Sequence, residues 1–385
     1  RVIVATFSSG IYLYNYVTGV IDSSFIERKM FNKLKELNVY CGARLHSGEI
    51  VLGTVADGLF VFDENGKYTG NWNSKNTDMQ DNTIYALYSD PSANTELWIV
   101  TDGFISKAYV NFPFYQFSAK SGLEGGINNF CEFEGSVYIS TDNGIYVSGI
   151  TEDGSRTFKQ FSDITDQAFP LTVASIGKEK FLLAGTLFHT YKISGNGKIS
   201  LLEGNNIITR NKVDQLAFDA RSIMQSSLNP QRFYFGLKSL GLKILDYENG
   251  KWRQIADIQG INGQVPFLKE LSNGDILALT NYPDGLYRIP YNDTIPIQYG
   301  PDKGLPEVSF NSLTEIDNTI VLCTTRGIFR LDVQEDKWVP YDQLTGGYTE
   351  NIYVERIFSD TLGNKWISTS EDRFYDLLFY MRNDT

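Results

Sequence analysis

At 385 residues, the chain is long enough for two ordinary domains or one large all-β domain, and its 23 Tyr, 25 Phe and 34 Gly favour the second. A formal net charge of −12 disfavours nucleic acid as a partner, because phosphate binding depends on clustered Lys and Arg. No apolar run approaches the ~20 residues of a membrane-spanning helix.

In chain order, the predicted elements repeat as pairs of strands. The leading strand of each pair is short and apolar and usually ends in Thr or Ser, and the returning strand follows a glycine and is rich in aromatic residues. Copies of the leading strand begin at Ile3, Val51, Leu97, Val137, Phe181, Phe233, Leu277, Val321 and Lys365. A spacing of about 40–52 residues is typical of β-propeller blades, each built from four strands.

Further strands complete each blade. One lies upstream of the pair, as at 83–88 and 265–268, and another follows a turn such as 63–66. Nine hairpins but eight upstream strands occur, because the chain begins inside a blade. We therefore predict an all-β fold, a β-propeller of four-stranded antiparallel blades, about eight in number, with seven or nine as alternatives. Residues 1–385 form one propeller, in which residues 351–385 either close the ring or start a further blade.

Other local patterns predict individual features of the core. Residues 25–37 have some helical spacing, with an outer strand and loop as the alternative. Trp98 and Trp366 occupy the middle-strand position of the repeat, so we predict them in the core. Trp252 and Trp338 follow turns and are predicted to pack between blades. The odd number of cysteines, each among apolar residues, predicts free thiols that pack as small apolar groups: Cys41, Cys131 and Cys323.

Three segments carry a resemblance to a known family. Residues 82–100 contain Asn-Thr-Ile-Tyr-Ala-Leu-Tyr-Ser-Asp and then Glu-Leu-Trp-Ile-Val, residues 358–369 contain Asp-Thr-Leu-Gly-Asn-Lys-Trp-Ile-Ser-Thr, and residues 299–306 contain Asp-Lys-Gly-Leu-Pro. This pattern resembles the two-component regulator propeller repeat, and the resemblance covers nearly the entire chain. It implies the extracytoplasmic sensor region of a hybrid two-component system histidine kinase or a related regulator, in the periplasm or at the cell surface.

The sequence offers little for catalysis. With only His46 and His189, a cluster of several histidines around a metal is excluded, and neither a nucleophile elbow nor a phosphate-binding glycine loop occurs. We predict that this chain is not an enzyme and holds no metal and no cofactor. A glycosidase using a pair of carboxylates, or a lyase using His189, is the third alternative.

A ligand site is expected at the turns between the two middle strands, which converge on one face of a propeller around its axis. Acidic, amide, aromatic and basic side chains there suit a hydroxyl-rich ligand, although Asp and Asn also favour turns whatever the function. The candidate ring consists of Asp57, Asp102, Asp142, Asn143, His189, Lys238, Tyr282, Asp284, Arg326 and Arg373.

The sequence therefore predicts a periplasmic sensor propeller that binds a small molecule or oligosaccharide, with a carbohydrate favoured. The alternative is a structural propeller of a cell-surface or secretion-associated protein that docks a protein partner or a second copy of itself. Nucleic acid is not expected, and a membrane is expected only through downstream segments that this sequence does not contain. Because the chain starts at Arg1 without Met or an apolar signal region, we expect a mature or excised piece.

Overall fold

The computed structural model describes residues 2–7, 9–90, 96–110, 117, 119–151, 156–161, 164–195, 197–202, 207–208, 218–239, 241–281, 283–305, 309–344, 353–371 and 375–381. These residues form sheets whose strands pair antiparallel except for one short parallel pairing, with one α-helix among them. They divide into two compact units, which are described separately: unit 1 is Arg1–Glu124 with Tyr146–Gln160, and unit 2 is Gly125–Ile145 with Phe161–Thr385. In the described part of the chain, no helix has the length and apolar character needed to cross a bilayer.

Unit 1 contains three sheets and the helix. The sheets are β1 (Val2–Thr6), β2 (Gly10–Tyr14) and β3 (Ile21–Asp22); β4 (Val39–Arg44), β5 (Ile50–Thr54), β6 (Leu59–Phe62) and β7 (Tyr68–Trp72); and β8 (Ile84–Ser89), β9 (Glu96–Thr101) and β10 (Phe104–Tyr109). Helix α1 (Arg28–Leu37) lies against β2. The helical interpretation of residues 25–37 is therefore confirmed for residues 28–37. Met30, Leu34 and Leu37 pack on the core at helical spacing.

Six further sheets follow, and their first strands all belong to unit 2. They are β11 (Ile127–Phe133), β12 (Ser136–Thr141), β13 (Gly144–Ile150) and β14 (Arg156–Gln160); β15 (Ala168–Ile176), β16 (Glu179–Thr186), β17 (Thr190–Ser194) and β18 (Ile199–Leu201); β20 (Ala220–Gln225), β21 (Arg232–Leu237), β22 (Leu242–Glu248) and β23 (Lys251–Ile258); β24 (Gln264–Glu270), β25 (Ile276–Asn281), β26 (Gly285–Ile289) and β27 (Ile297–Gln298); β28 (Phe310–Ile316), β29 (Thr319–Thr324), β30 (Gly327–Asp332) and β31 (Lys337–Pro340); and β32 (Tyr353–Ser359), β33 (Lys365–Glu371) and β34 (Tyr375–Met381).

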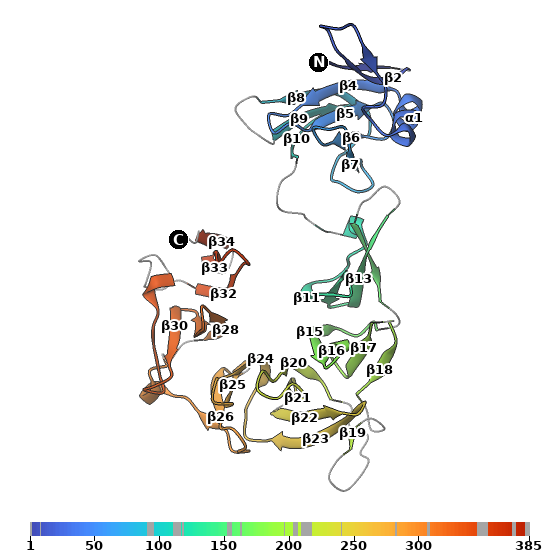
Figure 1. The fold of residues 1–385 in the computed structure, drawn as a ribbon. Coiled ribbons are helices and arrows are strands. Elements are labelled where there is room, and N and C mark those ends of the chain that lie inside the picture. Colours follow the sequence, from blue (N-terminus) through green and yellow to red (C-terminus); the bar gives the residue numbers. More distant parts are fainter. Residues whose placement is uncertain are drawn as a thin grey trace. The chain divides into compact units, whose positions relative to one another are not determined.

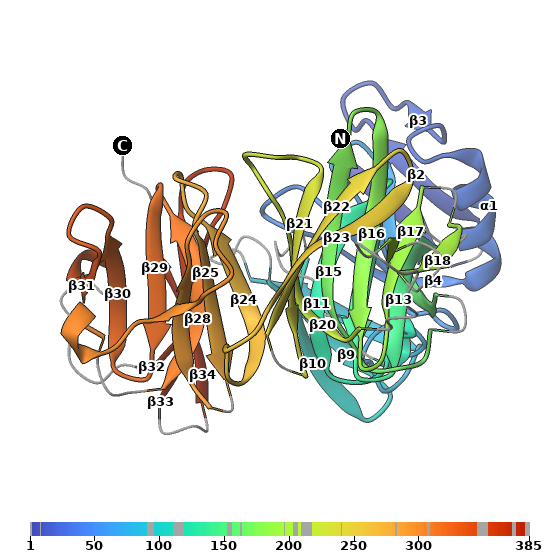
Figure 2. The same cartoon turned by 90° about the horizontal axis from the view of Figure 1, so that it is seen from below.

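Within unit 2, successive sheets are arranged through their first strands. Each first strand contacts the first strand of the next sheet, from β11 to β32, and these strands lie on the inner side of the arc that the sheets follow (Figure 1). Neighbouring sheets such as β24–β27 and β28–β31 stand side by side, with the axes of their long strands roughly aligned (Figure 2). The two middle strands of a sheet are the most buried where neighbouring elements cover both faces; all of β5 in unit 1 and most of β16 in unit 2 are buried.

The predicted strand order within a blade is confirmed. In the full sheets, the upstream strand, the two strands of the hairpin and the outer strand are neighbours in that order. The described residues form nine sheets, so the number eight is not confirmed. That residues 1–385 make a single propeller, with 351–385 closing it or starting a further blade, stays a prediction.

One prediction about the core is wrong. Trp98 is 40 % exposed and Trp366 is only half-buried. Leu97 and Ile99 pack toward β5 and β6, and because side chains alternate along a strand, Trp98 faces the other side of its sheet. By contrast, the predicted burial of the outer-strand tryptophans is confirmed, since both Trp252 and Trp338 lie in hydrophobic clusters.

The cysteines are free thiols, as predicted. Cys323 is buried, whereas Cys41 and Cys131 are half-buried. Burial raises the pKa of each of the three thiols to about 11, which keeps them protonated and weakly reactive at neutral pH.

A β-bulge recurs near the start of each first strand from β4 onward. One extra residue on the first strand shifts its register against the second strand, at Val39/Cys41, Ile84/Ala86, Ile127/Asn129, Ala168/Leu171, Ala220/Ser222, Gln264/Phe267, Phe310/Ser312 and Val354/Arg356. A bulge leaves backbone groups outside the ladder and redirects the local side chains. The repeat therefore places an irregular, partly polar site at the same position of eight sheets in the described chain.

Hydrogen bonds connect one bulge to the next. The Ser222 hydroxyl donates to the Val265 carbonyl oxygen at 2.6 Å, and the Ser312 hydroxyl donates to the Glu355 carbonyl at 2.6 Å. Similar bonds run from the Asn128 amide to the Ala168 carbonyl, from the Asn311 amide to the Val354 carbonyl, and from the Cys41 thiol to the Ile84 carbonyl. A donor in one sheet thus satisfies an acceptor that the bulge of the following sheet exposes.

Replacing Ser222 with alanine should lower the free energy of unfolding by about 1–3 kcal/mol, because the buried Val265 carbonyl would lose its partner. Urea unfolding of the purified chain measures this change. Ser175→Ala is the matched control: Ser175 lies on first strand β15, is exposed, and its hydroxyl makes no hydrogen bond among the described residues. Equal midpoints for the two variants would show that the bulge-to-bulge bond does not stabilise the fold.

Candidate functional site

Eight of the ten predicted ring residues lie in the loops where the sequence places them. Each occupies the connection between the second and third strand of its sheet: Asp57, Asp102, Asp142, Asn143, His189, Lys238, Asp284 and Arg326. The other two, Tyr282 and Arg373, lie outside the described residues. The contacts of their side chains indicate what these loops can bind.

In unit 1, Asp57 belongs to a local hydrogen-bond network. Its carboxylate accepts a hydrogen bond from the Asn73 amide at 3.1 Å and lies 3.6 Å from the Lys33 ammonium. The Asn71 amide donates to the Asp57 carbonyl at 2.8 Å, and both asparagines are buried. Asp57 therefore orders the loop that follows β7.

In unit 2, Asp142 bridges two sheets. Its carboxylate accepts hydrogen bonds from the Asn128 amide at 3.0 Å and from the Gln167 amide at 2.7 Å, and these bonds hold the pKa of the Asp142 carboxyl below its usual value. Asn128 belongs to the β11 bulge, whereas Gln167 immediately precedes β15. Asp142 thus supports the position of the bulge residue Asn128.

The remaining ring residues make mainly local contacts. The His189 Nδ1 atom lies 3.8 Å from an Asp166 carboxylate oxygen, and the His189 backbone is bonded to the Thr186 hydroxyl. Among the described residues, the side chains of Lys238 and Arg326 make no hydrogen bond or ion pair. In that part of the chain, no group of three or more His, Cys, Asp or Glu side chains is placed to hold a metal ion.

A cavity on the inner side of unit 2 offers more chemistry than the ring. It has a volume of about 340 Å³ and is lined by residues of β11, β15, β20 and β24, with Arg356 added from β32. None of the eight ring residues that the structure describes lines it. Its polar and aromatic lining residues include Asn128, Asn129, Phe169, Arg221, Phe267 and Arg356.

The bulges explain why these side chains reach the cavity. Asn128 and Arg221 are the extra residues of the β11 and β20 bulges, so they depart from the alternation of their strands. Pro170 and Pro266 fall within the bulges of β15 and β24, where the missing N–H of proline costs no ladder hydrogen bond. These two prolines, inside otherwise strand-like sequence, are the signal that could have indicated the site.

Two arginines in the cavity lie over aromatic rings. The Arg221 guanidinium carbon is 4.0 Å from the centroid of the Phe169 ring, and that of Arg356 is 5.7 Å from the centroid of the Phe267 ring. Such pairs keep a guanidinium in place beside an apolar surface while its N–H groups remain donors in their own plane. Together with the asparagine amides, they give the cavity both flat apolar surfaces and hydrogen-bond donors.

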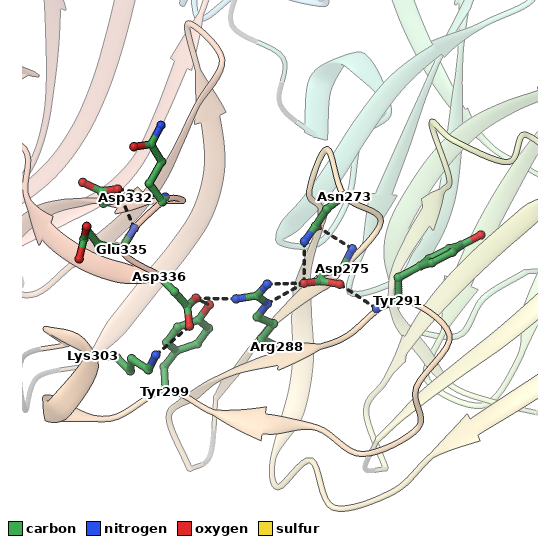
Figure 3. A network of polar contacts seen from close by, with 10 residues as sticks. Asn273, Asp275, Arg288, Tyr291, Tyr299, Lys303, Asp332, Glu335 and Asp336 are labelled. Atoms are coloured by element: carbon green, nitrogen blue, oxygen red, sulfur yellow. Dashed lines mark hydrogen bonds and ion pairs between the residues drawn. The ribbon is translucent and has the colours of Figure 1, made fainter.

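A second polar cluster joins two neighbouring sheets of unit 2 (Figure 3). Arg288 donates from Nε to the Asp275 carboxylate at 2.7 Å and from Nη1 to the Asp336 carboxylate at 2.6 Å. Asp336 also accepts from the Tyr299 hydroxyl at 2.6 Å and the Lys303 ammonium at 2.8 Å. Because each carboxylate is already shared by several donors, this cluster connects sheet β24–β27 to the β30–β31 turn and offers no ligand site.

The same contacts set the acidity of the two carboxyl groups. Burial alone would raise the pKa of Asp336, but the Lys303 and Tyr299 hydrogen bonds outweigh it and hold the pKa below its usual value. For Asp275, burial is likewise outweighed by the Tyr291 backbone N–H and by Arg288, so its pKa is also lowered. Both groups therefore stabilise the fold in their ionised form.

The comparisons with known proteins concern the fold. No model of a known protein family matches the chain, and no curated protein matches it in sequence. Two solved structures of the extracellular domain of BT4673 from B. thetaiotaomicron, a putative hybrid two component system in one description and a one component system in the other, are similar, with TM-scores of 0.53 and 0.50 at 15 % identity. They cover 98 % of this chain in both cases.

These neighbours are propeller-like. This chain has a propeller-like, all-β fold. The chain spans about half the length of the solved domains it matches, with 52 % and 51 % of them covered. A weaker similarity joins it to the extracellular domain of the putative hybrid two component system BT3049 from the same organism, with a TM-score of 0.41 at 18 % identity.

Replacing Asp336 with asparagine should lower the free energy of unfolding at pH 7 by about 1.5–3 kcal/mol, because charged hydrogen bonds in a partly buried cluster are lost. Since the folded-state pKa is lowered, the stabilisation is present above the unfolded-state pKa of about 3.9 and is lost as the pH falls through the folded-state value. The variant should therefore approach the parent chain in stability between pH 6 and about pH 3, as urea unfolding across that range would report.

The control for this experiment is Asp317→Asn, which removes the exposed ion pair with Lys365. It should change stability by no more than about 0.5–1 kcal/mol at any of these pH values. If the difference in free energy of unfolding between Asp336→Asn and the parent chain stayed constant down to pH 3, ionised Asp336 would not be the source of the stabilisation.

Proposed function

We propose that this chain is the extracytoplasmic sensor region of a two-component-type signalling protein, in the periplasm or at the cell surface, and that it binds a carbohydrate without transforming it. The observation that carries this proposal is the cavity on the first strands of unit 2, with its combination of aromatic rings and hydrogen-bond donors. The fold supports it, because the similar solved structures are extracellular domains of signalling proteins.

The lining suits a saccharide in particular. Sugar rings present apolar faces and a rim of hydroxyl groups, so they are bound by flat apolar surfaces combined with a few directed polar groups. The half-buried Phe267 supplies such a surface, and the Asn129 amide supplies a donor. Asn128, whose amide N–H groups bond to Asp142 and Ala168, supplies an accepting oxygen. A volume of about 340 Å³ lies within the range of small-molecule sites and would accommodate a short oligosaccharide segment.

The chemistry of the cavity favours binding over turnover. Hydrolysis of a glycosidic bond ordinarily requires two carboxyl groups beside the bond, and the part of the lining that the structure describes includes neither Asp nor Glu. His189, the residue that a lyase would need, does not line the cavity. The proposed binding does not involve a pair of carboxyl groups outside the cavity.

The position of the cavity suits a sensor. A ligand there would touch the bulges of four consecutive first strands, and bulge side chains also form the hydrogen bonds between sheets. A ligand that prefers one arrangement of these sheets would shift the population toward it. The ring of Asp57, Asp102, Asp142, Asn143, His189, Lys238, Tyr282, Asp284, Arg326 and Arg373 stays the alternative location for the ligand.

A thermal-shift screen of the purified chain against oligosaccharides, followed by calorimetry on each hit, tests the proposal. Asn129 lines the cavity, and we expect Asn129→Ala to weaken the binding of a hit by about tenfold. That loss of affinity corresponds to the free energy of one well-placed hydrogen bond. Asn143→Ala is the matched control, because it changes the same residue type in the same sheet at a ring position.

The outcomes separate the alternatives. Loss of binding with Asn143→Ala and not with Asn129→Ala would move the ligand to the ring. No binding to any sugar, together with a reproducible complex with a protein or a second copy of the chain, would favour the structural interaction propeller.

A further inference from the structure

The charge of the cavity lining is opposite to that of the chain. The whole sequence carries a formal net charge of −12, but the charged side chains that line the cavity are Arg221 and Arg356. Among the described residues, no Asp or Glu belongs to the lining. A cavity with two guanidinium groups and low-dielectric walls concentrates positive potential at one place in an otherwise acidic protein.

Two carboxylates on the lining strands have partners outside the cavity. Glu355, next to Arg356 on β32, accepts a hydrogen bond from the Ser368 hydroxyl. Glu270, at the far end of β24, accepts hydrogen bonds from Ser226 and Ser227. Both carboxylates are thus engaged by serine hydroxyls, and neither residue belongs to the cavity lining.

The two arginines reach the cavity from different sheets. Arg221 is the extra residue of the β20 bulge, and Arg356 closes the β32 bulge, with β24 and β28 between these strands in the sequence of sheets. Each lies over a phenylalanine of another sheet, Arg221 over Phe169 and Arg356 over Phe267. The exposed Arg356 guanidinium offers paired N–H donors, the geometry that binds a carboxylate or sulfate group with two hydrogen bonds, and the Arg221 guanidinium adds its positive charge.

We infer that the cavity selects an anionic saccharide, one whose sugar ring carries a carboxylate or a sulfate group, with Arg221 and Arg356 binding that group. This inference rests on the proposed function, because it names the class of carbohydrate that the same site takes. Neutral sugars would find only the amides and the aromatic faces, whereas an anionic sugar adds charge-assisted hydrogen bonds.

Calorimetry with three matched probes tests the inference: a galactose trisaccharide, the corresponding galacturonic acid trisaccharide, and the galactose trisaccharide carrying sulfate. We expect at least one of the two anionic probes to bind about tenfold or more tightly than the neutral one, with an affinity that falls as salt is added. The difference between the carboxylate and sulfate probes then identifies which anion the arginines accept.

Variants connect that selectivity to the two arginines. Arg356→Gln and Arg221→Gln should each weaken the anionic probe by about tenfold or more and leave the neutral probe unchanged. Arg356 is exposed, so its variant keeps the test valid if Arg221→Gln fails to fold. The matched control is Arg330→Gln, because Arg330 lies 5.9 Å from the Tyr341 ring centroid but does not line the cavity.

Each result has one meaning. Neutral binding as tight as anionic binding, unaffected by Arg356→Gln, would overturn the anionic selectivity and leave the carbohydrate sensor standing. Anionic binding that Arg330→Gln weakens as much as Arg356→Gln does would also overturn it, since the effect would then reflect overall charge. If all three probes fail, the inference is wrong, and the wider oligosaccharide screen decides the proposed function separately.

Discussion

One extra residue near the start of each first strand determines how neighbouring sheets meet. The bulge interrupts the ladder to the second strand and turns backbone carbonyls toward the adjacent sheet, as at Val265 and Glu355. Buried carbonyls without a donor are costly, so the adjacent sheet must supply one at a fixed position. Ser222 and Ser312 supply this donor. In both cases the donor and its acceptor are 43 residues apart, which is about the length of one repeat.

The same irregularity produces the candidate site. A regular strand would alternate its side chains between the two faces of its sheet, which pack against the neighbouring sheets. At a bulge, Asn128 and Arg221 leave that pattern and line the cavity, while the second strands, such as β16, supply the apolar burial that holds each sheet in place. Stability and recognition are therefore assigned to different strands of the same sheet, and Asn128 takes part in both by donating to Ala168.

Local signals explain what could be predicted from the sequence. The hairpins could be located because the local backbone geometry of their turns requires glycine. Gly144 has a φ of 113°, and a β-carbon there would lie 2.1 Å from the Ile164 carbonyl oxygen. For the cavity, the two prolines at its bulges are the one sequence signal, because Arg221 lines it only through its register against β21, a pairing that no short pattern encodes. The burial of Trp98 was wrongly predicted for a related reason, since it depends on which sheet covers each face of β9.

A short parallel pairing has a consequence for the outer strands. An outermost strand presents a row of unpaired backbone groups, onto which another extended chain can add and begin aggregation. In the sheet of β20 to β23, the segment β19 (Ile207–Ile208) pairs in parallel with Trp252 and Arg253 of the outer strand. The protein thus occupies part of that edge with its own backbone, and a foreign strand would have to displace β19 before it could extend the sheet there.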